Sequence, residues 1–168
     1  MLMLLRLPST RLVFVSSTPI ESAIIDYYLG LLPAVSRVDA QRRLVLFSAN
    51  DASPQTLTQK ILERPRLLER IRAAIGDPDP AHLTVFNSTA FERTLAVRLG
   101  IPLYGCDPAL LEIGGKSGSR QAFREAGIPL PDGAEDLRDT LDLTAALADL
   151  KGRNPRLARA VVKLNHGF

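Results

Sequence analysis

Lys163 stands where a lysine could bind an anion. It lies within the apolar run Ala160–Leu164, and His166 and Gly167 follow that run. A lysine on a buried strand is costly unless an anion meets its ammonium group. A glycine after such a strand leaves room for a loop to approach a phosphate. The pattern predicts a nucleotide phosphate contact at Lys163, and the alternative is an edge-strand lysine pointing to water.

Lys116 is the second candidate cation, between Gly115 and Ser117 in a glycine- and serine-rich run. A P-loop needs a glycine five residues before the glycine that precedes its lysine, and Leu110 occupies that position. The run also follows an expected helix rather than a strand. A P-loop is therefore excluded, and the simple alternative is a solvated lysine in a loop.

Hydroxyl groups follow the first expected strand, in the sequence Ser-Ser-Thr-Pro over 16–19. Without a G-x-G-x-x-G fingerprint, this turn does not predict dinucleotide binding. Ser17 and Thr18 either bind an anion at a helix N-terminus or cap the helix, and capping is favoured. The same two possibilities hold for residues 87–89, Asn-Ser-Thr.

No metal-binding pattern is visible, because the chain has one cysteine and two well-separated histidines. We expect Cys106 to be a small buried residue rather than a reactive thiol. A single cysteine allows no intrachain disulfide and favours a reducing, cytoplasmic location. The apolar start over 1–8 is short for a signal sequence and is expected to be a loose or edge-packed tail.

The composition indicates a globular chain with a real core. Hydrophobic residues make up 46% of the 168 residues and charged residues 23%, and the net charge is only +3. Basic residues are scattered and aromatic residues are 5%, so nucleic acid is not an expected partner. No run approaches the roughly 20 apolar residues of a membrane helix, so no membrane partner is expected either.

Strands and helices alternate in the first part of the chain. Each helix is expected to begin at a capping residue, with capping boxes at 18–21 and 89–92, and Pro65 should break a helix. The continuous apolar strands predict an α/β fold with a Rossmann-like, doubly wound, mostly parallel sheet. The expected strands are 11–17, 44–48, 83–87 and 101–105.

The character of the sequence changes after Ile113, where we place a domain boundary. Residues 1–113 are expected to form the Rossmann-like domain. Residues 114–168 begin with a glycine-serine loop over 114–119 and continue with a short helix over 120–126. An extended link, an amphipathic helix over 136–150 and the strand that carries Lys163 should follow.

These segments together resemble the junction between a pre-ATP-grasp domain and an ATP-grasp domain. The similarity covers the Gly-Ile-Pro-Leu-Tyr-Gly run at 100–105, the Gly-Lys-Ser-Gly-Ser-Arg run at 115–120 and the Ala-Gly-Ile-Pro link at 126–129. The chain is similar to bacterial carboxylate–amine ligases of the pheganomycin peptide ligase type, over nearly its whole length. The resemblance implies that residues 114–168 are an incomplete α+β ATP-grasp segment.

The resemblance assigns Lys116 and Lys163 to the phosphates of ATP, with Mg²⁺ bridging phosphate oxygens. It implies a ligase that activates a small-molecule carboxylate as an acyl phosphate and transfers it to an amine substrate. The phosphate flap, the adenine-binding hinge and the acidic magnesium ligands of the family have no counterpart in the sequence. The chain is therefore expected to be an N-terminal fragment that neither turns over nor binds ATP by itself.

A function of another class remains open. The chain is then a non-catalytic α/β binding or oligomerisation module, and a homo-oligomer is a possible assembly. The last strand and the tail over 1–7 would provide its contact surfaces, since an exposed strand edge pairs readily with another chain.

Overall fold

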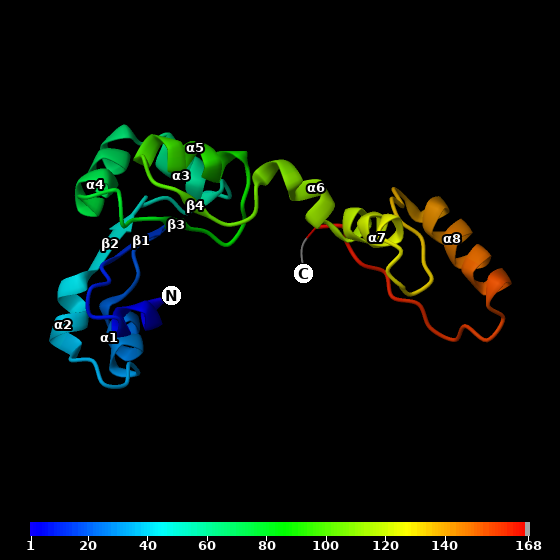
Figure 1. Cartoon of the computed structure of the whole chain (residues 1–168), viewed down its shortest axis with the longest axis horizontal. Helices are drawn as coiled ribbons and strands as arrows, with labels where there is room; N and C mark the ends of the chain where they lie inside the picture. The colour runs from blue at the N-terminus through cyan, green and yellow to red at the C-terminus, as the bar shows by residue number, and fades with distance from the viewer. Residues whose placement is uncertain (167–168) are drawn as a thin grey trace. The chain divides into compact units, whose positions relative to one another are not determined.

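The computed structural model of the chain (Figure 1) describes residues 1–166. Contacts divide the chain into two compact units, Met1–Gly105 (unit 1) and Cys106–Phe168 (unit 2). The domain boundary after Ile113, expected from the sequence, stays a prediction.

Unit 1 contains two pairs of parallel strands. β1 (Leu12–Ser16) pairs with β2 (Leu44–Ser48) over five residues, with Leu12 opposite Leu44. β3 (Leu83–Thr84) pairs with β4 (Leu103–Tyr104) over two residues. The helices are η1 (Leu2–Arg6), α1 (Ser22–Gly30), α2 (Arg37–Arg43), α3 (Leu57–Leu62), α4 (Pro65–Ile75) and α5 (Ala90–Leu99).

The structure confirms an α/β unit with parallel strands, but the two pairs are separate two-stranded sheets. A doubly wound sheet is not seen among residues 1–166. The later strands are shorter than the five residues expected for each. Pro102, just before β4, accepts from the N–H of Leu83 at 2.8 Å but has no N–H of its own to donate.

Some of the helix boundaries predicted from the sequence are confirmed, and one is wrong. The chain breaks between α3 and α4 and restarts with Pro65 as the first residue of α4, as predicted. Thr89 and Glu92 form the predicted capping box of α5. The capping box predicted at 18–21 is wrong, because α1 begins only at Ser22. There the Ser16 hydroxyl donates to the Thr18 carbonyl at 2.7 Å, and the helix starts four residues after Thr18.

Two apolar clusters form the core of unit 1. The larger lies among α3, α4, α5 and the β1–β2 pair, and the smaller is made by Leu5, Leu29, Leu32 and Ala40. The N-terminal residues are therefore not a loose tail, since Leu5 is fully buried. Arg43 also fixes them, because its guanidinium donates to the carbonyls of Leu5, Leu7 and Thr10 at 2.6–2.9 Å.

The described part of unit 2, residues 106–166, is helical and irregular and contains no strand. Its elements are η2 (Pro108–Leu110), α6 (Leu111–Gly114), α7 (Lys116–Glu125) and α8 (Thr140–Arg153). α8 begins later than expected because Asp139 caps it, with its carboxylate accepting from two backbone amides. In residues 1–166, no helix combines the length and apolar character needed to cross a membrane.

Candidate functional site

The two lysine-bearing segments of the sequence meet at the N-terminus of α7. The backbone N–H of Lys116 donates to the carbonyl oxygen of Asn165 at 3.2 Å. The N–H of Ser117 donates to Asn165 Oδ1 at 2.8 Å. These two bonds satisfy amides that have no partner within the helix. The segment that follows Lys163 thus docks on the helix that begins with Lys116, as Figure 1 shows for the C-terminal segment.

The strand predicted around Lys163 is wrong. Residues 158–164 have no regular structure, and Val161, Val162 and Leu164 are exposed. A strand needs a neighbour to satisfy its backbone hydrogen bonds, and residues 106–166 offer no other strand. Lys163 is correspondingly exposed rather than buried. Its contact with a phosphate stays a prediction, and Gly167 lies outside the described residues.

Lys116 occupies the first position of α7, not a loop. The glycine-serine loop predicted over 114–119 is wrong, because α7 already begins at Lys116. The reason is Gly118, where an added Cβ would lie only 2.1 Å from the carbonyl oxygen of Glu112. The glycine lets α7 pack against the backbone of α6. Lys116 is half-buried there, near the positive end of the helix dipole.

A pocket of about 330 Å³ lies beside α6 and α7. Carboxylates of Glu112, Glu125 and Asp136 line it, together with polar groups that include Ser117 and Asn165. Neither candidate lysine is among the lining residues, so the pocket does not hold both cations around one cavity. Three carboxylates repel a polyphosphate. In residues 1–166, no group of three or more histidine, cysteine or acidic side chains is arranged to hold a metal ion.

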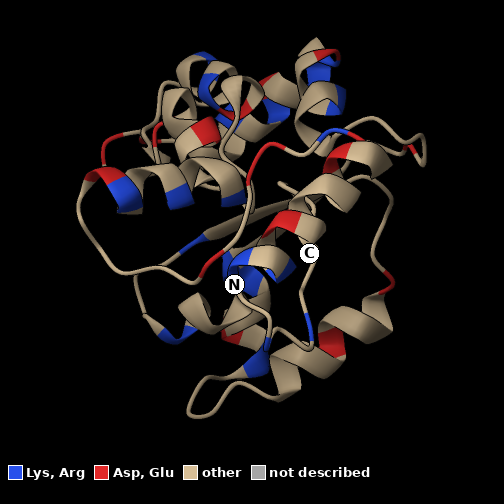
Figure 2. Ribbon diagram, turned by 90° about the vertical axis from the view of Figure 1, so that its right-hand side faces the viewer, with Lys and Arg blue, Asp and Glu red and all other residues tan. Residues whose placement is uncertain are grey.

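Ion pairs fix the link between α7 and α8. Arg120 and Arg124 of α7 both bind Glu135, and their guanidinium groups, Arg120 first, lower the pKa of that carboxyl. Arg153 of α8 binds Asp132 at 2.6 Å and lowers its pKa in the same way. Arg120, Arg124 and Arg153 thus attach α7 and α8 to the link between them. Figure 2 shows basic and acidic residues interspersed along the ribbon, with no stripe of one sign.

The residue that sequence reasoning missed is Lys60 of α3. Its side chain is among the largest fully buried ones, with 2% of the residue exposed. Its Nζ donates to the carbonyl oxygens of Asp51 and Ser53 at 2.9 and 2.8 Å, and to Ser17 Oγ at 3.2 Å. These acceptors follow the carboxyl ends of β1 and β2. Lys60 thus ties together the loops at the edge where parallel sheets commonly bind ligands.

Asp51 completes this cluster. Its carboxylate accepts from the backbone N–H of Ser53 at 2.8 Å and from Arg64 at 2.6 Å. Hydrogen bonds from the Ser53 side chain and backbone, with smaller effects of Arg64 and Lys60, lower the pKa of Asp51 to about 2. Helical spacing was the available signal, because Lys60 shares a face of α3 with Leu57 and Ile61.

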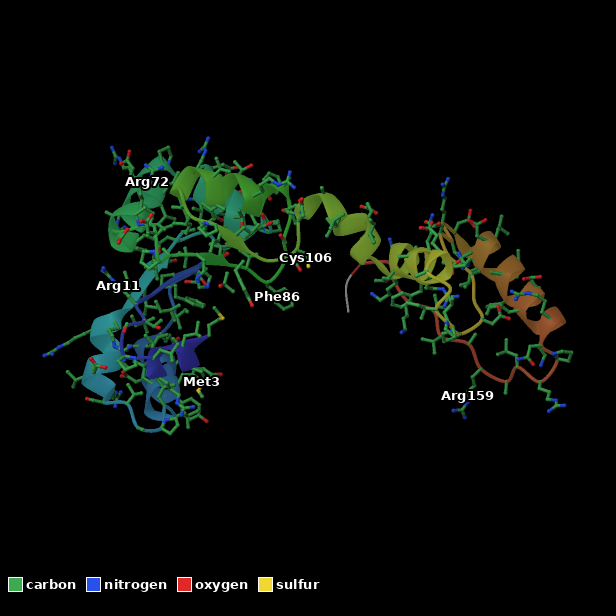
Figure 3. The ribbon with its side chains drawn as sticks, in the orientation of Figure 1. Met3, Arg11, Arg72, Phe86, Cys106 and Arg159 are labelled. Carbon is green, nitrogen blue, oxygen red and sulfur yellow. The ribbon has the colours of Figure 1, made fainter. Side chains whose placement is uncertain are left out.

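Two of the hydroxyls proposed as anion ligands in unit 1, those of Ser17 and Thr89, have structural partners. Ser17 accepts the Lys60 hydrogen bond, and its carbonyl accepts from the N–H of Asp51 at 2.8 Å. Thr89 caps α5, which is the favoured alternative. Cys106 is exposed, so the expectation of a buried cysteine is wrong. Phe86, after β3, is also strongly exposed and points away from the ribbon (Figure 3).

Two known proteins are similar to the chain over nearly its whole length. The chain is 30% identical to an L-propargylglycine–L-glutamate ligase of Streptantibioticus cattleyicolor over 96% of its own length. It spans about a third (34%) of that ligase. It is also 27% identical to the IQ motif-containing protein H of Danio rerio, over 94% of the chain and 16% of that protein. No family model and no solved structure matches the chain.

Proposed function

We propose that this chain is the N-terminal portion of an ATP-dependent carboxylate–amine ligase of the ATP-grasp type. The observation that carries the proposal is the similarity to a ligase over 96% of the chain. Residues 1–113 then correspond to the Rossmann-like leading domain, and an incomplete ATP-grasp segment covers residues 114–168. The parallel β1–β2 and β3–β4 pairs support the first assignment, although they are separate in this structure.

The whole ligase would form an amide in two steps. A carboxylate oxygen attacks the γ-phosphorus of ATP, the bond to the ADP oxygen breaks, and an acyl phosphate forms. The amine nitrogen then attacks the acyl carbon, inorganic phosphate leaves, and the nitrogen loses a proton. By analogy with the relative, we propose that two amino acids are the carboxylate and amine substrates.

Lys116 and Lys163 are the residues that we assign to the phosphates of ATP. Two ammonium groups near one polyphosphate offset its charge and orient it. The docking of Asn165 on the N-terminus of α7 supports this assignment, because it brings both lysine-bearing segments to one place. The helix N-terminus adds a partial positive charge there.

Residues 1–166 contain no group of three or more histidine, cysteine or acidic side chains arranged to hold magnesium. Its ligands would belong to the part of the ligase that corresponds to the rest of the relative. We therefore propose that the chain alone does not turn over ATP.

The test uses the full-length ligase that contains this chain. ADP release is measured with ATP, L-glutamate and L-propargylglycine as the first substrate set. We expect Lys163→Ala to lower the rate by about 100-fold or more, as loss of a group that stabilises transition-state charge does. Arg159→Ala is the matched control, because Arg159 is an exposed cation of the same irregular segment and projects from the ribbon (Figure 3).

Three results would contradict the proposal or its assignment of Lys163. ADP release that needs neither an amine nor a carboxylate substrate would exclude a ligase. Wild-type turnover by Lys163→Ala would remove that lysine from the site, and an equal loss in Arg159→Ala would show a general effect of charge rather than a phosphate contact.

A non-catalytic association module is the second candidate function. The observation that favours it is the number of large apolar side chains that unit 1 exposes, on η1 and α1 in particular.

A further inference from the structure

Asn165 supplies, from far along the chain, the cap that helix α7 does not have locally. Gly115 stands at the N-cap position of α7 and has no side chain that could accept a hydrogen bond. Asn165 Oδ1 takes this role, because it accepts from the N–H of Ser117 at 2.8 Å. The carbonyl oxygen of Asn165 also accepts from the N–H of Lys116 at 3.2 Å. One residue thus satisfies two amides that a helix cannot pair by itself.

The surroundings of the Asn165 carboxamide fit this capping role. Its nitrogen lies 3.2 Å from His166 Nε2, while its oxygen faces the N–H of Ser117. His166 Nε2 in turn lies 3.8 Å from Glu112 Oε2 of α6. Gly115 leaves room for both residues, since an added Cβ there would lie 3.1 Å from Asn165 Oδ1 and 3.0 Å from His166 Cε1. The same glycine therefore deprives α7 of a local cap and admits the distant one.

Residues 158–166, which we call the strap, are tethered at both ends. Before the strap begins, Lys151 Nζ of α8 donates to the carbonyl oxygens of Pro155 and Leu157 at 2.8 and 2.7 Å. The other tether is the cap on α7. Between these contacts the strap forms neither helix nor strand. The two tethers therefore restrict where the strap and its side chains lie.

Lys163 belongs to the strap and lies two residues before the cap. Two residues span at most about 7 Å, so docking keeps the Cα atom of Lys163 within that distance of the Cα atom of Asn165. We propose that Asn165 is a positioning residue for ATP, which holds Lys163 beside Lys116 by capping α7. This inference rests on the proposed assignment of the two lysines to the phosphates of ATP. Without the cap, Lys163 would be on a strap that is tethered at one end only.

The first experiment measures the docking of the strap in the 168-residue chain, without ATP. NMR gives the amide exchange rates of Lys116 and Ser117 in isotopically labelled protein. Amides in the first turn of a helix have no partner within it, so protection at these two positions reports the strap. We expect Asn165→Ala to speed the exchange of Ser117 by about fivefold, the usual effect of losing a cap. The Lys116 amide should also exchange faster, because its acceptor leaves with the strap.

Two further variants separate capping from other effects of the substitution. Asn165→Asp keeps an oxygen that accepts from the helix amides, and aspartate caps helices as well as asparagine does. Protection of both amides should therefore survive in this variant. Asn154→Ala is the matched control, because Asn154 Oδ1 also accepts from a backbone N–H, that of Arg156 at 3.2 Å, but at the C-terminal end of α8. It should leave the exchange at the start of α7 unchanged.

The second experiment tests positioning in the full-length ligase that contains this chain. We expect Asn165→Ala to raise the KM for ATP by up to about fivefold, since a smaller fraction of molecules holds Lys163 in place. A loss of folded enzyme would lower kcat and leave KM unchanged, so KM distinguishes positioning from a folding defect. In a Lys163→Ala background, Asn165→Ala should have no further effect, because the lysine that it positions is absent. Asn154→Ala should leave the KM for ATP unchanged.

Each experiment can overturn the proposal by itself. Amides of Lys116 and Ser117 that exchange as fast in the wild type as in Asn165→Ala would show that the cap does not hold the strap. An unchanged KM in Asn165→Ala, or the same increase with and without Lys163, would refute the positioning role. Wild-type turnover by Lys163→Ala would remove the lysine from the site and the positioning role with it. The exchange rates do not depend on the ligase reaction, so a failure of the cap is distinguishable from a failure of the proposed function.

Discussion

Replacing Lys60 by methionine tests whether the buried lysine stabilises unit 1. Methionine keeps the length and apolar stem of the side chain and removes only the ammonium group. The change therefore deletes three hydrogen bonds, to the carbonyls of Asp51 and Ser53 and to Ser17 Oγ, while it leaves the packing of α3 nearly intact.

The magnitude follows from two opposing terms. Hydrogen bonds to a charged group contribute about 1.5–3 kcal/mol each, so the two short bonds and the longer one to Ser17 sum to roughly 5–8 kcal/mol. Methionine avoids the cost of burying an ammonium group, which is several kcal/mol. The difference leaves a net destabilisation of about 2 kcal/mol, because the carbonyls of the loop lose a partner that water replaces only in part.

Urea unfolding followed by intrinsic tyrosine fluorescence isolates this effect. The chain has no tryptophan, and its three tyrosines, Tyr27, Tyr28 and Tyr104, all lie in unit 1, so the signal does not report on unit 2. Arg66→Met is the control, because it also replaces a cation by methionine but at an exposed position of α4. It should change the free energy of unfolding by less than about 0.5 kcal/mol.

A Lys60→Met variant as stable as the wild type, or more stable, would refute the reasoning. It would mean that the desolvation cost of the ammonium group cancels all three hydrogen bonds, as happens for some buried ion pairs. The lysine would then be retained for a reason other than stability.

Two further predictions concern acid and packing. Asp51 has its pKa lowered from 3.8 to about 2, so its carboxylate stabilises the fold above its unfolded pKa. That stability is lost as the pH falls through about 2, and tyrosine-detected acid unfolding of Asp51→Asn should be less pH-dependent between these values. Gly118→Ala should destabilise unit 2 by several kcal/mol, because the new methyl would overlap the Glu112 carbonyl at 2.1 Å. Loss of helix by circular dichroism measures it, with Gly152→Ala, which has open space, as the control; equal effects of the two substitutions would contradict a packing role.

The sequence predicted a helix boundary correctly only where residues close together in the chain determine that boundary. Pro65 ends one helix and starts the next, because its ring clashes with the carbonyl of the preceding helical turn and it has no N–H to donate. The Thr89–Glu92 capping box forms from four consecutive residues. The same spacing at Thr18–Glu21 failed, since the chain leaving β1 first turns at Thr18, and no local rule contains that constraint.

The sheet and the candidate site depended on partners that periodicity does not reveal. The β3–β4 pair is short, and a doubly wound order cannot be read from alternation alone. The contact between Asn165 and the N-terminus of α7 joins residues that are 48 positions apart in the sequence. The sequence located both segments, but periodicity could not show that they contact each other. The glycine at 118 suggested a loop, yet its role is close packing of two helices.

Lys60 is buried and Lys163 is exposed, and the physical difference between a helix and a strand explains why. Lys163 has an apolar residue on either side in the sequence, which is the signal that pointed to it, whereas Lys60 lies between Gln59 and Ile61. A helix satisfies its own backbone, so α3 can bury one face as soon as acceptors for the ammonium group lie within reach, and two strand-end loops supply them. A strand must first find another strand, and residues 106–166 contain none. In this chain, therefore, the nearby acceptors and the self-sufficiency of the backbone decide which lysine is buried, and an apolar flank alone does not.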